Sequence, residues 1–546
     1  MILETFSLGL IIPMVGLLTQ DDYKTKIPFA DSLFSNFDQR QLLVVAMLFV
    51  VVIYIIKSSF VYWSALHQRR FVNAASARVS QDTFTKYLRQ PYEFHLERNS
   101  ATLIANVENA KAIITGGLDP ILVLLTDGLV AIGLFSLLIY IEPVGTLCVV
   151  ALFSVSAVTF RVLTRERIHR WGTARKFHSR KVLQHLQQGL GGAKEIKVLG
   201  REQQFLMDHE RHLYSNMDVD RRFTMMQLLP RLWLETLTMI GLAALVLIMI
   251  GSGTSISSIL PTLGLFAATA FRVMPSISRI LASIQTIGYT RPLALTVFRD
   301  LQLTDDVDQR AGTQSEFERS IELIDVTFRY KDAHRPALLN VSFRVDRGEA
   351  VGIIGTSGAG KSTLVDVLLG LLSPSSGKVC IDGKDIADHR RWWQDQVGYV
   401  PQTIYLTDDT LLNNVAFGLP VEDIDRDAVG RAITAAQLDE FVGSLPDGLD
   451  TIVGERGVRL SGGQRQRIGI ARALYHDPSV LVLDEATSAL DSETESGVME
   501  AVRGLLGKKT VIIVAHRTTT VSYCNRILRF EDGSLVAQGN PAELLA

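Results

Sequence analysis

This sequence has few cysteines and a small net charge. The three cysteines, Cys148, Cys380 and Cys524, lie far apart, and that spacing implies neither a disulfide framework nor a zinc site. The formal net charge is −2, which gives no reason to expect a nucleic-acid partner. The first residues lack the basic segment of a signal peptide, so we expect no cleavable leader. The function must therefore be sought in what the chain does contain.

Long apolar runs fill the first half of the chain, up to about residue 285. A membrane-spanning helix needs about 20 mostly apolar residues. Five segments are long enough, namely 42–64, 119–141, 144–163, 228–251 and 256–279. A sixth, at 2–19, is short for a span. If all six cross, both ends of this half lie on the same side of the membrane.

Lysine and arginine are unevenly distributed between the loops. They cluster after the second and fourth spans, at 69–98 and 165–181, whereas the opposite loops are short or mixed in charge. An excess of Lys and Arg marks cytoplasmic loops, so we place both clusters in the cytoplasm. They leave two cytoplasmic hairpins, near 90–105 and 188–200, where a soluble domain can be contacted. The outer stretch 27–37 fits either an amphipathic helix on the membrane surface or a loop packed on the bundle.

After the last span the pattern turns polar, and strands then alternate with helices. This alternation is typical of a P-loop domain. We expect a membrane domain over 1–290, a linker over 291–320 and an α/β domain over 321–546. The expected fold is thus an α-helical membrane domain of six spans fused to an α/β P-loop domain.

A glycine-rich run in the α/β domain follows an apolar strand and precedes a helix, as a phosphate-binding loop requires. The run consists of Gly355, Thr356, Ser357, Gly358, Ala359, Gly360, Lys361, Ser362 and Thr363. The glycines let backbone N–H groups surround phosphate oxygens, and the helix N-terminus adds positive potential. Lys361 is expected to reach the β- and γ-phosphates of ATP, and the Ser362 hydroxyl to coordinate Mg²⁺. The alternative is a glycine turn that binds no nucleotide.

Two adjacent carboxylates follow the apolar strand at 479–483. Where a strand end opens onto a phosphate site, Asp484 is expected to coordinate Mg²⁺ and Glu485 to orient or deprotonate the attacking water. The alternative is a pair of residues that caps the next helix. His516 follows a further apolar strand and is either a contact of the γ-phosphate or a structural histidine.

A second anion-binding surface lies more than a hundred residues after the first. It consists of Leu460, Ser461, Gly462, Gly463 and Gln464, which open a helix. A serine and two glycines at a helix N-terminus favour anion binding. One nucleotide does not need two such cradles within one domain. We therefore expect the second cradle to serve the nucleotide of a partner subunit.

The five residues Leu460 to Gln464 resemble the signature motif of the ATP-binding cassette (ABC) transporters. Lys361, Asp484, Glu485 and His516 also match the pattern of this family. The resemblance is to exporters in which the membrane and ATPase domains are fused. It is weak in the membrane half and strong after residue 321. It implies two identical subunits that share two composite ATP sites.

The same resemblance implies roles for three further residues. Tyr330 would stack on adenine, Gln402 would sense Mg²⁺ and the attacking water, and Asp491 would lie across the dimer from the nucleotide. Members of this family usually begin with a cytoplasmic elbow helix and a full first span, whereas Met1 lies inside the first apolar run. We expect either a misassigned start or an incomplete first helix.

Within the family, the membrane half is most similar to bacterial lipid-linked oligosaccharide flippases, which turn over polyprenyl-diphosphate glycans. The likeness lies in the apolar outer loop and in basic residues in or near the spans, namely Lys57, Arg231, Arg272 and Arg279. Guanidinium groups suit a diphosphate headgroup. The alternatives are cations that reach towards the membrane surface and an ion pair between Arg231 and Glu235.

The leading expectation is therefore an ATP-driven flippase of a lipid-linked oligosaccharide. We expect it to be a multi-pass protein of the bacterial cytoplasmic membrane, surrounded by lipid and with its ATPase domain in the cytoplasm. A multidrug or lipid-A-like exporter is the alternative substrate class. A soluble cassette ATPase would lack the spans, and a gated channel or regulatory subunit usually has a degenerate ATP site. An importer generally carries its ATPase on a separate chain.

Overall fold

The computed structural model describes residues 39–141, 143–251, 256–305, 316–454, 457–458, 460–486, 492–515 and 517–545. The chain divides into two compact units. The helical unit comprises residues 1–90 and 94–305, and the α/β unit comprises residues 91–93 and 306–546. The expected 2–19 span and the 27–37 stretch lie outside the described residues.

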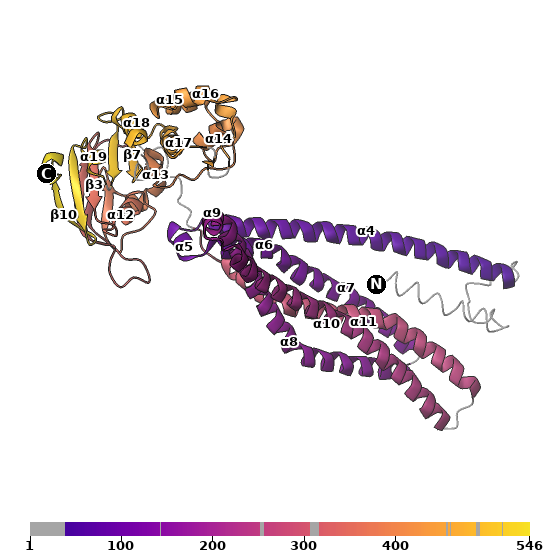
Figure 1. Ribbon diagram of the computed structural model, residues 1–546. Coiled ribbons are helices and arrows are strands. Elements are labelled where there is room, and N and C mark those ends of the chain that lie inside the picture. Colours follow the sequence, from indigo (N-terminus) through magenta and orange to yellow (C-terminus); the bar gives the residue numbers. More distant parts are fainter. Residues whose placement is uncertain are drawn as a thin grey trace. The chain divides into compact units, whose positions relative to one another are not determined.

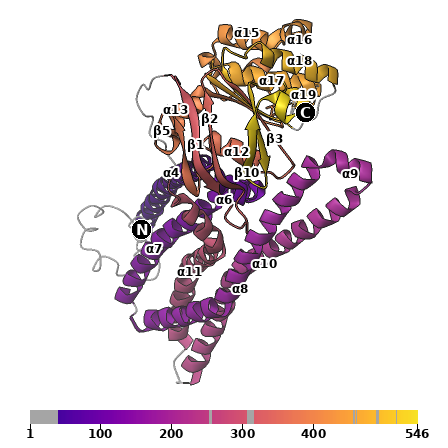
Figure 2. The ribbon, with the colours of Figure 1, turned by 90° about the vertical axis from the view of Figure 1, so that its left-hand side faces the viewer.

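Long helices build the helical unit (Figure 1). In chain order the helices are α4 (Gln39–Leu88), α5 (Tyr92–Glu97), α6 (Ser100–Ile113), the π-helical turn η2 (Ile114–Leu118), α7 (Asp119–Ile141), α8 (Pro143–Gly191), α9 (Ala193–Leu199), α10 (Glu202–Gly251) and α11 (Ile256–Leu301). The first two residues of α5 belong to the α/β unit. Figure 2 shows α8 and α10 running side by side to the short α9, which closes a helical hairpin between them.

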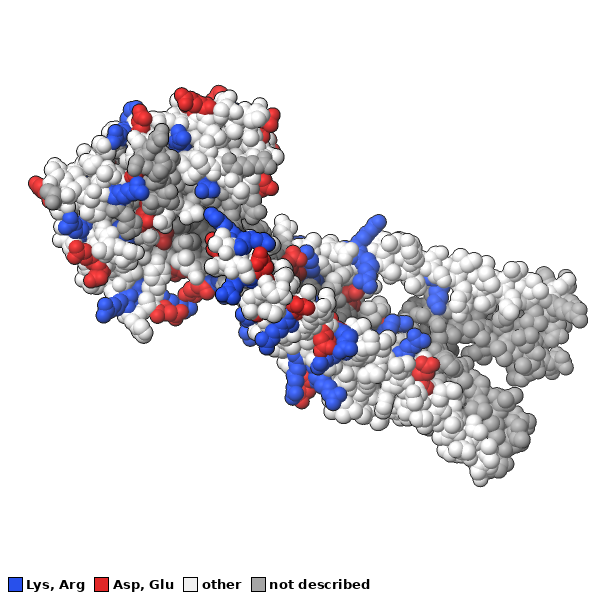
Figure 3. All heavy atoms as spheres, in the orientation of Figure 1, with Lys and Arg blue, Asp and Glu red and all other residues white. Residues whose placement is uncertain are grey.

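All five apolar segments expected to span a membrane fall inside these helices. The segment 42–64 lies in α4, 119–141 is α7, and the remaining three lie in α8, α10 and α11. By length and composition, Met47–Leu88, Ser100–Ser136 and Glu202–Gly251 qualify as membrane-crossing stretches among the described residues. On the face shown in Figure 3, lysine and arginine gather over one half of the helical unit, and the other half is largely uncharged. A charged half and a largely uncharged half are expected if the loops rich in lysine and arginine lie outside the membrane on one side.

The helices pack through small buried clusters. In one cluster, Phe153 of α8 meets Leu234 of α10 and Val273 of α11. In another, Phe223 of α10 stacks on Tyr289 of α11 with ring centroids 3.8 Å apart. Both clusters join α11 to the hairpin of α8 and α10.

Helix α11 extends into the segment that was expected to be the linker. The helix continues to Leu301, so the first residues of the predicted 291–320 linker are helical. Leu293 and Val297 are buried and lie one helical turn apart, so the apolar periodicity continues past residue 290 although the local composition turns polar. The predicted domain boundaries remain a prediction.

Two sheets form the α/β unit. An antiparallel sheet has the order β2-β1-β4-β5, and a larger sheet has the order β10-β9-β3-β8-β7-β6. In the larger sheet β3, β6, β7, β8 and β9 run parallel, and β10 is antiparallel to β9. The strands are β1 (Ser320–Phe328), β2 (Leu338–Asp346), β3 (Ala350–Gly355), β4 (Ser376–Ile381), β5 (Lys384–Asp385), β6 (Val397–Val400), β7 (Val480–Asp484), β8 (Thr510–Val514), β9 (Arg526–Glu531) and β10 (Ser534–Gly539).

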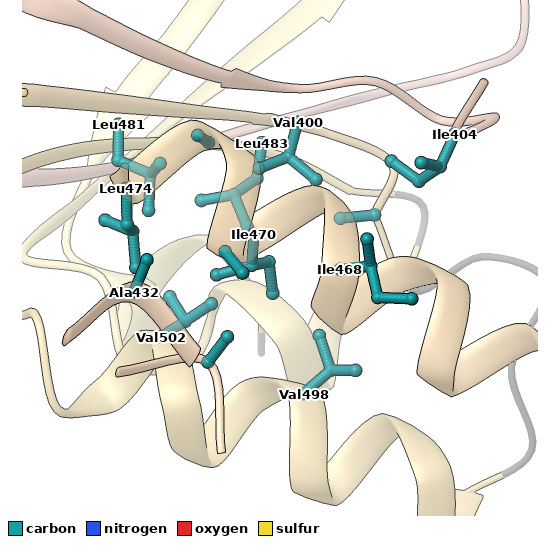
Figure 4. Close-up of a cluster of buried hydrophobic side chains, with 14 of the residues drawn as sticks. Val400, Ile404, Ala432, Ile468, Ile470, Leu474, Leu481, Leu483, Val498 and Val502 are labelled. Carbon is teal, nitrogen blue, oxygen red and sulfur yellow. The ribbon is translucent and has the colours of Figure 1, made fainter. Parts of the chain in front are cut away.

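Helices cover the larger sheet and bury its apolar strands. They are α12 (Lys361–Leu368), α13 (Arg390–Gln396), α14 (Leu411–Val415), α15 (Arg426–Ala435), α16 (Asp439–Ser444), α17 (Gly462–Leu474), α18 (Ser492–Arg503), α19 (Thr518–Val521) and α20 (Pro541–Leu544). Figure 4 shows Ile470 of α17 between Leu483 of β7 and the valines of α18. Since β3, β8 and β7 are neighbours and parallel, their carboxyl ends meet at one edge of the sheet. The functional residues lie along this edge.

Candidate nucleotide site

The glycine-rich run forms a tight loop between β3 and α12. Gly358 and Gly360 have φ angles of 83° and 91°, in the left-handed region that glycine adopts without strain. A Cβ on Gly360 would lie 2.4 Å from the Ala337 carbonyl oxygen, so this position also needs glycine for space. Glycine at these positions allows the tight turn that a phosphate-binding loop makes before the N-terminus of its helix.

Lys361 is buried at the first position of α12, and its ammonium group points back over the loop. The Nζ atom donates to the carbonyl oxygens of Gly355 at 2.9 Å and Thr356 at 3.0 Å. Burial lowers the pKa of Lys361, while the charges of Glu485 and Asp484 oppose this shift. The ammonium group is thus bonded to the loop and lies within electrostatic range of Asp484, the last residue of β7, and of Glu485, which follows it.

Asp484 is the last residue of β7, and its carboxyl group is buried. Burial, and to a lesser extent the charge of Glu485, raise the pKa of Asp484 to about 6. Its Oδ1 atom has no hydrogen-bond partner in the described part of the chain. A buried carboxylate oxygen without a partner suits a hard cation, and Ser362 in the first turn of α12 offers a hydroxyl. These residues fit Mg²⁺, which would neutralise phosphate charge there.

Glu485 adopts a strained backbone conformation next to Asp484. Its φ angle is 50°, which is uncommon for a residue with a side chain, and its N–H donates to the Val514 carbonyl oxygen at 2.9 Å. Gln402 Nε2 donates to Glu485 Oε2 at 2.7 Å. The structure therefore brings together two residues 83 positions apart that were expected to act on the same water.

The second cradle opens α17 with a complete capping box. Gln464 N–H donates to Ser461 Oγ at 3.2 Å, and Ser461 N–H donates to Gln464 Oε1 at 2.8 Å. This pair fixes the orientation of the helix N-terminus. Gly462 and Gly463 occupy the first two positions of the helix and leave its N–H groups unobstructed.

The remaining expected nucleotide contacts are only partly described. The hydroxyl oxygen of Tyr330 lies 3.1 Å from Thr363 Oγ1, so its ring is anchored beside α12; stacking on adenine remains a prediction. His516 and Asp491 lie outside the described residues, and their roles also remain predictions.

Sequence reasoning missed two residues of the α/β unit. Asp366 lies on α12, and burial, together with the charge of Asp484, raises its pKa to about 6. Arg472 of α17 donates from Nε to the Asn414 carbonyl oxygen at 2.8 Å and from Nη1 to the Tyr405 carbonyl oxygen at 2.8 Å. It thereby ties α17 to α14 and to the segment that precedes α14. Neither residue belongs to a recognisable motif, so only the folded chain identifies them.

The four basic residues expected to bind substrate have different surroundings. Lys57 lies over the Tyr54 ring, 5.2 Å from its centroid. Arg279 forms a bidentate ion pair with Asp127 of α7, with Nε and Nη2 at 2.7 and 2.8 Å from the carboxylate oxygens. Arg231 is exposed, and the side chain of Arg272 is not described. No motif links Asp127 to Arg279, which lies 152 residues away, so this ion pair was not expected from the sequence.

Comparisons with known proteins cover both units. The family model described as ABC transporter matches residues 338–488, and the one described as ABC transporter transmembrane region matches residues 25–274. A protein of Shewanella frigidimarina named ATP-dependent lipid A-core flippase is 30% identical over 494 residues, 86% of this chain and 78% of that protein. A protein of the same name from Cupriavidus metallidurans is 45% identical over 244 residues, 43% of this chain and 40% of that protein.

A solved structure shares the whole fold. The structure described as a bacterial Atm1-family ABC exporter with ATP bound has a TM-score of 0.80 and 24% sequence identity, and the match covers 100% of this chain and 95% of that one. These matches confirm the expected fold class, a helical membrane domain of the exporter type fused to an α/β P-loop domain.

Proposed function

This chain belongs to the ABC transporter family and is an ATP-driven half-transporter of the exporter type, and from this premise we propose that it flips a lipid with a phosphorylated headgroup across the membrane. The observation that carries the proposal is the match to proteins named lipid A-core flippases across most of the chain. A lipid-A-like substrate is therefore the first candidate, ahead of the lipid-linked oligosaccharide expected from the sequence.

A polyprenyl-diphosphate oligosaccharide is the second candidate. It is favoured by the guanidinium groups of Arg231 and Arg279 in α10 and α11, with Arg272 on the same helix as Arg279. Guanidinium forks match the geometry of a diphosphate. The ion pair of Arg279 with Asp127 weakens this support, because the carboxylate already occupies that fork.

The working unit of the proposal is a homodimer with two composite ATP sites. An exporter half-transporter implies dimerisation, and this chain carries both a phosphate loop and a second helix N-terminal cradle. Ser362, Gln402 and Asp484 would hold Mg²⁺, and Glu485 would act on the attacking water. The bacterial relatives and the basic cytoplasmic loops favour the bacterial cytoplasmic membrane, with the ATPase domain inside.

Reconstitution of the full chain into proteoliposomes tests the substrate class. Fluorescently labelled lipid A, a labelled polyprenyl-diphosphate glycan and a neutral hydrophobic drug are offered separately, and ATP-dependent transfer is followed by loss of access to a membrane-impermeant quencher. We expect lipid A to be transferred fastest and Glu485→Gln to abolish transfer. Equal transfer of the neutral drug would instead identify a multidrug exporter.

A further inference from the structure

A cavity of about 340 Å³ lies between α8 and α11 of the helical unit. Phe160, Leu281 and Ile284 provide apolar wall, and Gly288 keeps part of the wall free of a side chain. The volume is at the lower end of the range for small-molecule sites, which is about 300–1,000 Å³. The cavity can therefore enclose a headgroup but not a whole lipid.

Three arginines line this cavity, and none of them pairs with an acidic side chain in the part of the chain that the structure describes. Arg161 and Arg165 lie one turn apart on α8, and Arg291 lies on α11. Within the described ranges none of the three forms an ion pair, whereas Arg279 on the same helix as Arg291 pairs with Asp127. Like charges that share a wall repel one another, and a bound anion relieves that repulsion.

The same wall contains a buried amide, that of Gln285. Gln285 is 5% exposed, and neither its Nε2 nor its Oε1 atom has a hydrogen-bond partner among the described residues. The nearby Gln227 does find one, because its Nε2 donates to Thr286 Oγ1 at 2.9 Å. A buried polar group without a partner is costly and calls for an explanation. An amide donor beside three guanidinium groups is suited to an oxygen-rich anion.

We infer that this cavity is a binding site for a phosphate-bearing headgroup. The guanidinium groups of Arg161, Arg165 and Arg291 contact the phosphate oxygens, and the Gln285 amide donates to a phosphate oxygen or bonds a neighbouring hydroxyl. Arg161 lies near the end of the apolar segment 144–163, and Arg165 lies one helical turn after Arg161, just outside that segment. A lipid bound there keeps its acyl chains beside apolar helix surface.

This site differs from the residues expected from the sequence, since Lys57, Arg231 and Arg279 are not among the described residues that line it. The assignment of the headgroup to a lipid rests on the proposed function. The shared chemistry, a phosphate ester, also occurs in soluble sugar phosphates. The experiment therefore separates the two sources.

The full chain is placed in nanodiscs of phosphatidylcholine with a small fraction of phosphatidic acid, and bound phosphatidic acid is counted by native mass spectrometry without ATP. We expect the parent protein to enrich phosphatidic acid over phosphatidylcholine. Arg161→Gln with Arg165→Gln should weaken that binding at least about tenfold, because each hydrogen-bonded charge contact is worth a factor of this order. Arg167→Gln is the matched control: it lies on the same helix, outside the cavity, and removes the same charge.

Two further variants probe the buried amide. Gln285→Glu keeps the shape and adds a negative charge, so it should abolish enrichment, whereas Gln285→Leu should weaken it severalfold. An excess of glucose 6-phosphate that displaces phosphatidic acid would identify a soluble sugar phosphate as the ligand source. A failure to displace it would identify the lipid headgroup.

Equal binding by the Arg161→Gln, Arg165→Gln double variant and by the Arg167→Gln control would overturn the site. So would unchanged enrichment by Gln285→Glu. Because the binding is measured without ATP, its outcome is independent of transport. Enrichment at this cavity without ATP-driven lipid transfer would refute the proposed function and leave the site standing.

Discussion

At the scale of single residues, Glu485 is held by two contacts that leave it little freedom. Its backbone N–H is bonded to Val514 and its carboxylate accepts from Gln402. A side chain fixed in this way beside Asp484 suits the role proposed for Glu485, which is to act on the water that attacks the γ-phosphate. The strained φ angle of 50° is consistent with a conformation retained for function.

We expect Glu485→Gln to bind ATP normally and to hydrolyse it about 10²–10⁴-fold more slowly, since a general-base or water-orienting group contributes a factor of that size. Phosphate release measured at saturating ATP gives the rate. We also expect the variant to accumulate as an ATP-closed dimer, which cross-linking between the two subunits of the full chain detects. Turnover close to that of the parent protein would remove Glu485 from the mechanism.

The raised pKa of Asp484 predicts how the free energy of unfolding depends on pH. The folded state raises its pKa to about 6, above the value of about 3.9 in an unfolded chain. The folded state thus binds the proton more tightly, so the stability that this group contributes is present below about pH 4 and is lost as the pH rises through about 6. At neutral pH the ionised carboxylate costs about 3 kcal/mol of folding free energy, because each pKa unit corresponds to about 1.4 kcal/mol.

Without Mg²⁺ and nucleotide, Asp484→Asn should therefore unfold at a higher temperature than the parent protein at pH 7.5, and the difference should narrow towards pH 5. Differential scanning fluorimetry of the two purified proteins measures their unfolding temperatures at both pH values. Asp408→Asn, an exposed site with the same chemical change, serves as the control. A difference that does not depend on pH would show that the buried charge is not the cause.

At the scale of elements, the bidentate pair of Arg279 with Asp127 joins α11 to α7. The Asp127 side chain is 11% exposed and the Arg279 side chain 54%. Removing one partner of such a pair leaves the more buried charge uncompensated, whereas removing both does not.

Arg279→Gln alone should lower the unfolding temperature by about 2–4 °C, and Arg279→Gln combined with Asp127→Asn should restore it. Lipid transfer by the double variant then distinguishes the two roles of Arg279. Restored transfer assigns the pair to structure alone. Restored stability without transfer places Arg279 on the substrate path.

The helices and strands were largely predictable from the sequence, because apolar runs and glycine positions are local signals. The strand before Gly355 and the helix opened by Ser461 follow from such signals, and the helix expected over 364–369 is present but begins earlier, at Lys361. The pairs that give the sites their chemistry were not predictable. Gln402 and Glu485, and Asp127 and Arg279, are brought together only by the packing of distant segments. Nothing in the sequence distinguishes Gln285 from an ordinary polar residue, and only the structure shows that it is buried.

At the scale of the whole molecule, two cradles on one chain predict that each ATP site needs two copies. Lys361→Ala should lose nucleotide affinity, because the buried ammonium group between loop and carboxylates is gone. Ser461→Arg should still bind ATP in the isolated subunit and yet fail to hydrolyse it, because the cradle offered to the partner is blocked. Fluorescent nucleotide binding and phosphate release measure the two effects separately.

Mixed dimers complete this test. One copy of each variant leaves one site with neither defect, so a mixture should recover part of the activity that either variant lacks alone. Loss of ATP binding by Ser461→Arg as severe as that of Lys361→Ala would instead place both cradles on the same nucleotide.

The length of the helices has a mechanical consequence. Helix α10 contains 50 residues, which at about 1.5 Å per residue makes a rod of roughly 75 Å, whereas the hydrocarbon layer is only about 30 Å thick. More than half of such a rod extends beyond the lipid and acts as a lever arm. A tilt of about 10° at one end displaces the other by roughly 13 Å. Small rearrangements at one end of these helices are thereby amplified into displacements wide enough to admit or release the headgroup of the proposed lipid substrate.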